Sequence, residues 1–183
     1  MAQSGYAICY TELEDGIVSL NVEVYRSRID RARDYADIWE IVKDSAKDTL
    51  GEYRVGMMLF LDDLPPQLGA YHSLGTNNIV LNRALVQIVE VTTEKKGHVN
   101  AFIYSLLLHE YLHALGHIPE AEVRSLVYRV SKECFGEDHV TTRLAEKSPW
   151  ALLKDFPLSE LEVPRRVMEI VRDFERPDQK YIA

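Results

Sequence analysis

The chain has 183 residues, of which 46% are hydrophobic and 27% charged, and this is ordinary for one globular domain with a real core. Its two cysteines exclude a disulfide framework, and its net charge of −8 argues against nucleic acid as a partner. The N-terminus lacks a signal-peptide pattern and no apolar run is long enough for a membrane span, so we expect a cytoplasmic protein without a membrane partner.

The first half of the chain predicts one helix and then a small sheet. Gly51 is the expected C-terminal cap of an amphipathic helix, whose apolar stripe is Ala32, Tyr35, Ala36, Trp39, Val42, Ala46 and Leu50. The nearly continuous apolar run over 53–61 predicts a buried central strand. Two shorter runs, 69–72 and 78–82, flank a turn and predict two more strands. We therefore expect a mixed or antiparallel sheet of about three strands.

Residues 109–117 read H-E-Y-L-H-A-L-G-H inside an apolar stretch of helical character, and they hold three of the six histidines of the chain. A helix places residues i and i+4 on one face, so His109 and His113 can both bind one Zn²⁺ at about 2.0–2.1 Å. Glu110 lies about 100° around the helix, where it can take a proton from water at the metal. The motif predicts a zinc-dependent hydrolase of peptide bonds. The alternative is a buried helix whose histidines only bind neighbouring groups.

A third zinc ligand is expected after the motif, because catalytic zinc normally takes three protein ligands. Gly116 can end the first helix and Pro119 suits the first position of the next one. The short turn predicts an αα-hairpin, and folding the chain about 117–118 brings His113 opposite residues near 122. Glu122 is therefore the predicted third ligand.

Glu120 and His117 remain alternatives for this position. His117 would lie about 12 Å along an unbroken helix from His109, beyond the reach of one ion, unless the helix ends before it. Acidic residues also favour the first turn of any helix because of its dipole, and this alone would explain one of the two glutamates.

H-E-x-x-H followed by a glutamate on the next helix resembles the gluzincin metallopeptidases, and most of all the small archaeal-type minigluzincins. The resemblance is specific over 109–135 and looser over 53–108. The metzincin pattern fails, because Pro119 stands at its last histidine. The resemblance implies a single zincin-like α+β domain, with a small sheet packed on the active-site helix, a glutamate helix after it and a helical C-terminal part. It also implies zinc on His109, His113 and a glutamate, and Glu110 as general base.

Other residues are expected to act on the substrate, a peptide or an unfolded protein. Small metallopeptidases of this kind carry an edge strand on which an extended peptide pairs. We assign this role to residues 78–82 or to 69–72, although either could be an ordinary edge strand; the first choice contains Asn78, Ile79, Val80 and Leu81. His139 and Tyr128 are candidate donors to the oxyanion. A histidine on a loop surface and a tyrosine on an outer helix face are the simpler interpretations.

The C-terminal third predicts mainly helix. Apolar residues at helical spacing suggest a last helix between residues 163 and 174, and the tail beyond it could cover a cleft. We expect one metallopeptidase-like domain over 1–183, with an upper lobe at 1–116 that carries the sheet and the zinc helix, and a helical lower lobe and tail at 117–183. Two rival functions remain: a catalytically restricted or inactive metallopeptidase-fold regulatory protein that acts on a single partner, and a structural protein without metal.

Overall fold

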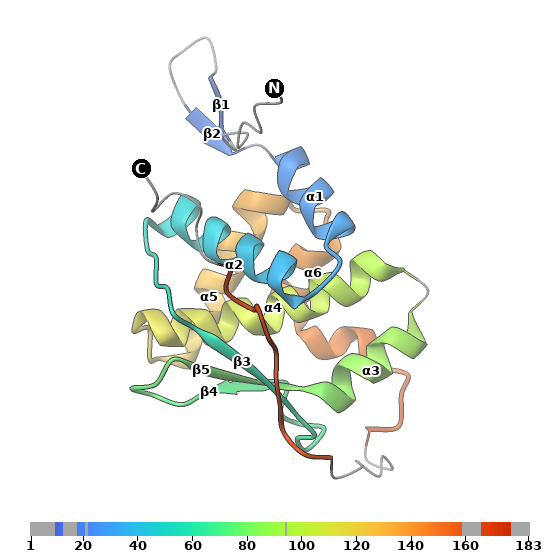
Figure 1. Ribbon diagram of the computed structural model, residues 1–183. Coiled ribbons are helices and arrows are strands. Elements are labelled where there is room, and N and C mark those ends of the chain that lie inside the picture. The colour runs from blue at the N-terminus through green and yellow to red at the C-terminus, as the bar shows by residue number, and fades with distance from the viewer. Residues whose placement is uncertain (1–9, 13–17, 21, 94, 159–165, 177–183) are drawn as a thin grey trace, which may run out of the picture.

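A computed structural model describes residues 10–12, 18–20, 22–93, 95–158 and 166–176 of the chain. These residues form a single α+β domain in which six α-helices pack with a four-stranded mixed sheet, as Figure 1 shows. The helices are α1 (Val22–Arg31), α2 (Tyr35–Leu50), α3 (Arg83–Thr92), α4 (Lys96–Leu115), α5 (Glu120–Phe135) and α6 (Val140–Lys147). The predicted fold class, the single domain and the helical C-terminal part are confirmed; the division into two lobes at residue 116 stays a prediction.

The sheet has the strand order β4-β5-β3-β6, and a separate hairpin of β1 (Tyr10–Glu12) and β2 (Val18–Leu20) precedes the helices. In the sheet, β5 (Asn78–Asn82) lies between β3 (Met58–Asp62), to which it is parallel, and β4 (Ala70–His72), to which it is antiparallel. The strands predicted at 69–72 and 78–82 are thus confirmed.

The central strand is shorter than the apolar run over 53–61 suggested, because β3 begins only at Met58. Before it, the backbone binds side chains instead of a neighbouring strand. The N–H of Arg54 donates to the Tyr111 hydroxyl (2.7 Å), and the N–H of Met57 donates to the Glu175 carboxylate (2.6 Å).

The last helix expected between 163 and 174 is not formed over the described residues 166–176; residues 159–165 and the tail from 177 lie outside the described part. The chain instead forms β6 (Glu169–Ile170), which pairs antiparallel with β3. Apolar spacing misled the prediction: Val167 is 89% exposed, and among the apolar residues described at 166–176 only Phe174 is buried, against Trp39. Pairing with β6 satisfies backbone groups that an open edge of β3 would leave free.

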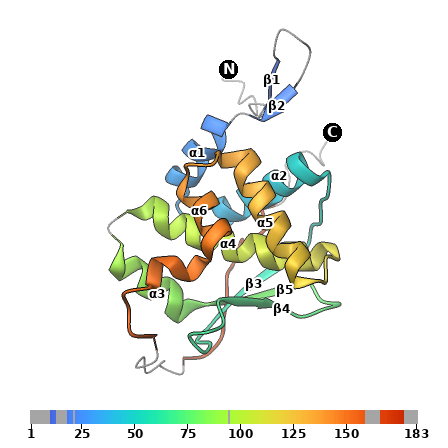
Figure 2. The ribbon, with the colours of Figure 1, turned by 180° about the vertical axis from the view of Figure 1, so that it is seen from behind.

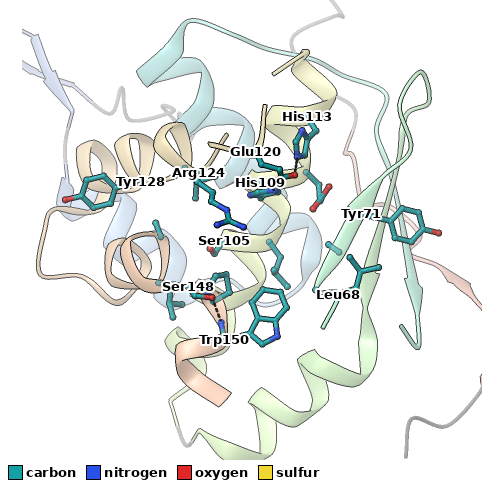
Figure 3. A pocket seen from close by; sticks show the side chains of 18 of the residues that line it. Leu68, Tyr71, Ser105, His109, His113, Glu120, Arg124, Tyr128, Ser148 and Trp150 are labelled. Carbon is teal, nitrogen blue, oxygen red and sulfur yellow. Dashed lines mark hydrogen bonds and ion pairs between the residues drawn. The ribbon is translucent and has the colours of Figure 1, made fainter. Parts of the chain in front are cut away.

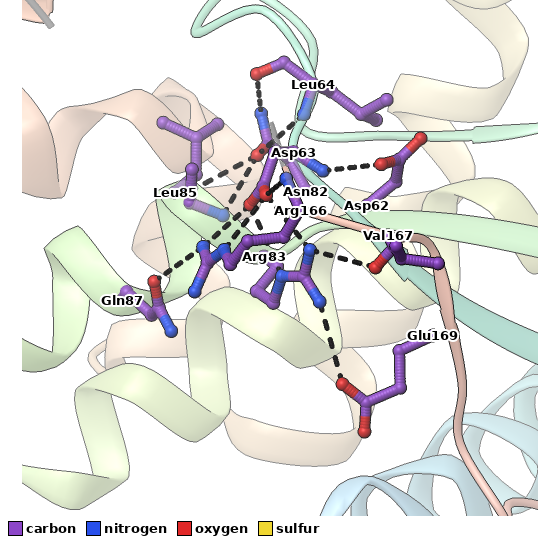
Figure 4. Close-up of polar contacts among 11 residues, drawn as sticks. Asp62, Asp63, Leu64, Asn82, Arg83, Leu85, Gln87, Arg166, Val167 and Glu169 are labelled. Atoms are coloured by element: carbon purple, nitrogen blue, oxygen red, sulfur yellow. Dashed lines mark hydrogen bonds and ion pairs between the residues drawn. The ribbon is translucent and has the colours of Figure 1, made fainter. Parts of the chain in front are cut away.

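A buried carboxylate fixes this C-terminal segment to the sheet, as Figure 4 shows. Asp63, at the end of β3, is 1% exposed at its side chain and accepts two hydrogen bonds from the Arg166 guanidinium, at 2.7 and 2.9 Å. Arg83 at the start of α3 donates to the same carboxylate (2.9 Å). The hydrogen bond from Arg166 is the largest cause that holds the pKa of Asp63 well below its usual range.

Helix α4 forms the centre of the domain and packs against all five other helices and against β4 and β5. Most of its length from Val99 onward is buried, as expected for a helix that is apolar around its circumference. Figure 2, the view from behind, shows α5 and α6 beside α4. The described residues contain no helix with the length and apolar character that a bilayer crossing requires.

Candidate metal centre

The turn after α4 is built as the sequence indicated. Gly116 ends the helix with a φ of 110°, a conformation that favours glycine, and its N–H donates to the His113 carbonyl (3.0 Å). After Pro119 the chain enters α5 at Glu120, which forms the predicted hairpin. The end of α4 and the beginning of α5 are therefore adjacent, and side chains from both helices can meet.

Two histidines of α4 and one glutamate of α5 meet at this junction. The Nε2 atom of His109 lies 3.4 Å from Glu120 Oε2, and the Nε2 atom of His113 lies 3.1 Å from Glu120 Oε1. One ligand atom from each of the three residues can be chosen such that all lie within 4.8 Å of one another. A tetrahedral ion with bonds of about 2.0–2.2 Å holds its ligand atoms about 3.3–3.6 Å apart. His109, His113 and Glu120 thus form a group that could hold a metal ion.

The orientation of the His113 ring also suits a cation. Its Nδ1 lies 2.8 Å from the His117 carbonyl oxygen, which can only accept, so Nδ1 carries a hydrogen. In the neutral imidazole, Nε2 then carries a lone pair, and this lone pair faces a Glu120 carboxylate oxygen. Two acceptors at 3.1 Å repel each other unless a proton or a metal ion lies between them.

The surroundings of His109 favour its neutral form. Burial lowers the pKa of His109; the charge of Glu120 raises it, and the charges of His113 and Arg124 lower it further. The net lowering favours the neutral imidazole, which is the form that binds metal ions.

The structure does not bring Glu122, the predicted third ligand, to the two imidazoles. Its Oε1 atom lies 2.8 Å from Nδ1 of His117, and Nε2 of the same ring lies 3.1 Å from Glu52. Two residues apart on a helix means about 200° of rotation, so only one of Glu120 and Glu122 can face α4. Glu120, kept as an alternative, takes that position and contacts both imidazoles.

His117, the other alternative, also lies outside the group. Its ring donates to two carboxylates, and the hydrogen bond to Glu122 is the largest cause that raises its pKa, with Glu52 adding to the effect against partial burial. The residue ties the turn to the segment after α2 and is engaged on both ring nitrogens.

Glu110 lies beside the candidate metal centre and is only 8% exposed. Burial raises the pKa of Glu110 to about 7, while the charge of His113 and a backbone hydrogen bond from His72 oppose the rise and the charge of Glu120 adds to it. The Glu110 carboxylate and His72 of β4 both line the same cavity. A carboxyl group with a pKa near neutrality can both accept and release a proton at physiological pH.

A cavity of about 960 Å³ opens onto these residues, as Figure 3 shows. Its walls come from β4 and the loop before it, from α4, α5 and α6, and from the 3₁₀-helix η1 (Pro149–Leu153). The loop is held by the buried Asn82 side chain, which donates to the carbonyl groups of Leu64, Pro65 and Leu68. At Gly69 a Cβ atom would lie 2.6 Å from a methyl carbon of Leu106, so a larger residue here would require the Leu106 side chain to move.

The strand next to the cavity is β4. The first choice for the strand on which a substrate could pair, residues 78–82, therefore has to be corrected. Asn78, Ile79, Val80 and Leu81 belong to β5, whose two edges are already paired with β3 and β4. A substrate peptide cannot add to an occupied edge. Among the described strands of the sheet, β4 has an edge without a partner strand and lines the cavity, which agrees with the second choice, 69–72.

The two candidate oxyanion donors lie away from the imidazoles. Tyr128 lines the cavity, but Figure 3 shows its ring at the far end, directed away from His109. His139 is not among the cavity residues: it caps α6 by accepting from the Thr141 N–H, and its ring stacks on Phe135. Sequence reasoning missed Arg124, which lines the cavity one helical turn after Glu120. Its i+4 spacing from that glutamate was the available signal.

Comparison of the chain with protein-family models, with curated proteins and with solved structures gave no match. The geometry of the described residues is therefore the basis for the function.

Proposed function

We propose that the protein is a zinc-dependent peptidase of the gluzincin type, with zinc held by His109, His113 and Glu120. The observation that carries the proposal is the convergence of two imidazole Nε2 atoms and one carboxylate beside a buried Glu110. Nitrogen and oxygen donors in this number suit catalytic zinc, which leaves a fourth position open. Bound zinc would act as a Lewis acid and lower the pKa of water in the site towards about 7.

Glu110 would serve as the general base and then as the acid. Its carboxylate accepts a proton from the attacking water and passes it to the amine that leaves. The pKa of about 7 belongs to the metal-free protein; a zinc ion beside Glu110 would favour the carboxylate, which is the form that acts as the base. Burial also removes competing water from the carboxylate.

The substrate would be a peptide or an unfolded protein segment in extended form. The unpaired edge of β4 lies next to the cavity, where main-chain hydrogen bonds could align a substrate strand. The backbone of His72 in β4 lies close enough to the Glu110 carboxylate to oppose the rise in its pKa, so this strand and the general base are neighbours. An extended chain on β4 would therefore pass the residues that carry out hydrolysis.

The test is the variant Glu110→Gln in the zinc-loaded protein, assayed on casein and on unstructured peptides. We expect one zinc ion per chain in both proteins, and cleavage by the parent that falls at least about 100-fold in the variant. Equal cleavage by the two proteins would refute the role of Glu110. Bound zinc without turnover of any substrate by the parent would favour a regulatory protein with the same metal site.

A further inference from the structure

Arg124 brings a positive charge into the cavity beside the candidate metal centre. It follows Glu120 by four residues on α5, so both side chains leave the same face of the helix, about 6 Å apart along its axis. Figure 3 shows the Arg124 side chain extending from α5 towards Ser105 and His109 of α4. The guanidinium therefore points into the space where a substrate would lie.

This guanidinium forms no ion pair with a carboxylate among the described residues. The acid nearest to it on the same helix face, Glu120, directs both oxygens at the imidazoles, and a metal ion there would take up its charge. The other charged side chains of the cavity, besides Glu110, are Glu146 and Lys147, of opposite sign, near the end of α6. Arg124 thus lines the cavity as an exposed cation without a carboxylate partner among the described residues.

The side chain of Arg124 is exposed, and the same cavity is also lined by the apolar residues Leu106, Val127, Leu144 and Trp150. A substrate bound against these walls would cover the guanidinium and displace water from it. A guanidinium binds a carboxylate through two parallel hydrogen bonds, and hydrogen bonds to charged groups contribute about 1.5–3 kcal/mol, more where water is excluded. The natural ligand for Arg124 is therefore a carboxylate.

We propose that Arg124 binds a carboxylate of the substrate, one or two residues from the peptide bond that is cleaved. The proposal rests on the peptidase function above. The distance follows from the offset of about 6 Å between Arg124 and Glu120, since an extended peptide advances about 3.3–3.6 Å per residue. Two sources have this chemistry: the C-terminal carboxylate of a short peptide, and the side chain of an aspartate or glutamate.

The experiment uses matched peptides and two readouts. One pair differs only in a free or an amidated C-terminus, and the others differ only in Glu or Gln at the first or second residue on either side of the cleaved bond. Peptide affinity is measured by calorimetry on the zinc-loaded Glu110→Gln protein, and kcat/KM is measured on the otherwise unchanged protein. Both are repeated with Arg124→Gln, with Arg124→Glu, and with the control Arg129→Gln, which removes an exposed α5 arginine paired with Glu133.

With Arg124 present, we expect the carboxylate peptide of one pair to bind about 10- to 100-fold more tightly than its neutral partner. Arg124→Gln should reduce this ratio to about 3-fold or less. Arg124→Glu should reverse it, so that the neutral peptide binds more tightly, and Arg129→Gln should change nothing. The pair that responds identifies the source. No discrimination in any pair, or an Arg124→Gln variant that lowers kcat equally for every peptide, would overturn the proposal. Carboxylate-dependent binding without turnover would contradict the peptidase function and leave the Arg124 site standing.

Discussion

Glu120 and Glu122 offer a matched pair of variants, because both are glutamates in the first turn of α5. The structure places the Glu120 carboxylate 3.1–3.4 Å from the two imidazole nitrogens and the Glu122 carboxylate on His117. Glu120→Gln should therefore remove a zinc ligand. Glu122→Gln should leave the metal group intact and remove only one ion pair from the turn.

The expected size of the difference follows from linkage. Zinc at 100 times its Kd stabilises the folded chain by about 2.7 kcal/mol, which raises the Tm of a domain of this size by about 5–11 °C. Loss of outer-shell partners alone weakens metal affinity by about 10- to 100-fold, so we expect at least about 100-fold for a direct ligand. At the same zinc concentration, the stabilisation would then be about 0.4 kcal/mol and the shift in Tm about 1–2 °C.

Differential scanning calorimetry of the chelator-treated proteins, with and without added zinc, measures this directly. We expect Glu122→Gln to have a lower Tm than the parent without zinc, since its ion pair is lost, and to keep the full zinc-dependent rise. Glu120→Gln should lose most of the rise. The reverse pattern, with the rise lost in Glu122→Gln and kept in Glu120→Gln, would refute the ligand set.

Three further predictions concern stability and pH. The raised pKa of Glu110 means that the metal-free protein loses stability as pH increases from about 4.5 to 7. In urea unfolding, the free energy of unfolding of metal-free Glu110→Gln should therefore exceed that of the parent by up to about 3 kcal/mol at pH 8 and by little at pH 4.5. The lowered pKa of Asp63 contributes stability above about pH 4 that is lost as pH falls further. Asp63→Asn should therefore lower the free energy of unfolding by about 1–3 kcal/mol at pH 7, and it should lose less stability than the parent below pH 4. An equal loss below pH 4 in both proteins would contradict the pairing of Asp63 with Arg166. The raised pKa of His117 contributes stability below about pH 6.5 that is lost as pH rises through the folded-state pKa. His117→Gln should therefore reduce the difference in unfolding free energy between pH 6 and pH 9. An equal difference in the parent and the variant would count against the bonds from His117 to Glu52 and Glu122.

The sequence located the two histidines and the hairpin but not the third member of the group. Spacing within one helix fixes His109 and His113 on a common face, whatever the rest of the fold does. The choice between Glu120 and Glu122 depends instead on the rotation of α5 about its axis. That rotation is set by where the second helix starts and by what its apolar face buries, and a one-residue change in the start turns the helix by about 100°.

The fold shows the same division between local and long-range information. The cap at Gly51 and the strands at 69–72 and 78–82 follow from nearby residues and are confirmed. The pairing of β6 with β3 joins residues more than 100 positions apart, and no local pattern announces it. Strand order also decides which edge is free, so the substrate strand could not be chosen between β4 and β5 from the sequence. Arg124 was missed for a related reason: its i+4 spacing from Glu120 can be read from the sequence, but the cavity that both side chains line cannot.

The most direct test of the metal centre is a crystal structure of the zinc-loaded protein with anomalous diffraction measured at the zinc absorption edge. We predict one anomalous peak at about 2.0–2.2 Å from Nε2 of His109, Nε2 of His113 and a carboxylate oxygen of Glu120. The absence of a peak at this position, or a peak whose protein ligands include Glu122 in place of Glu120, would contradict it.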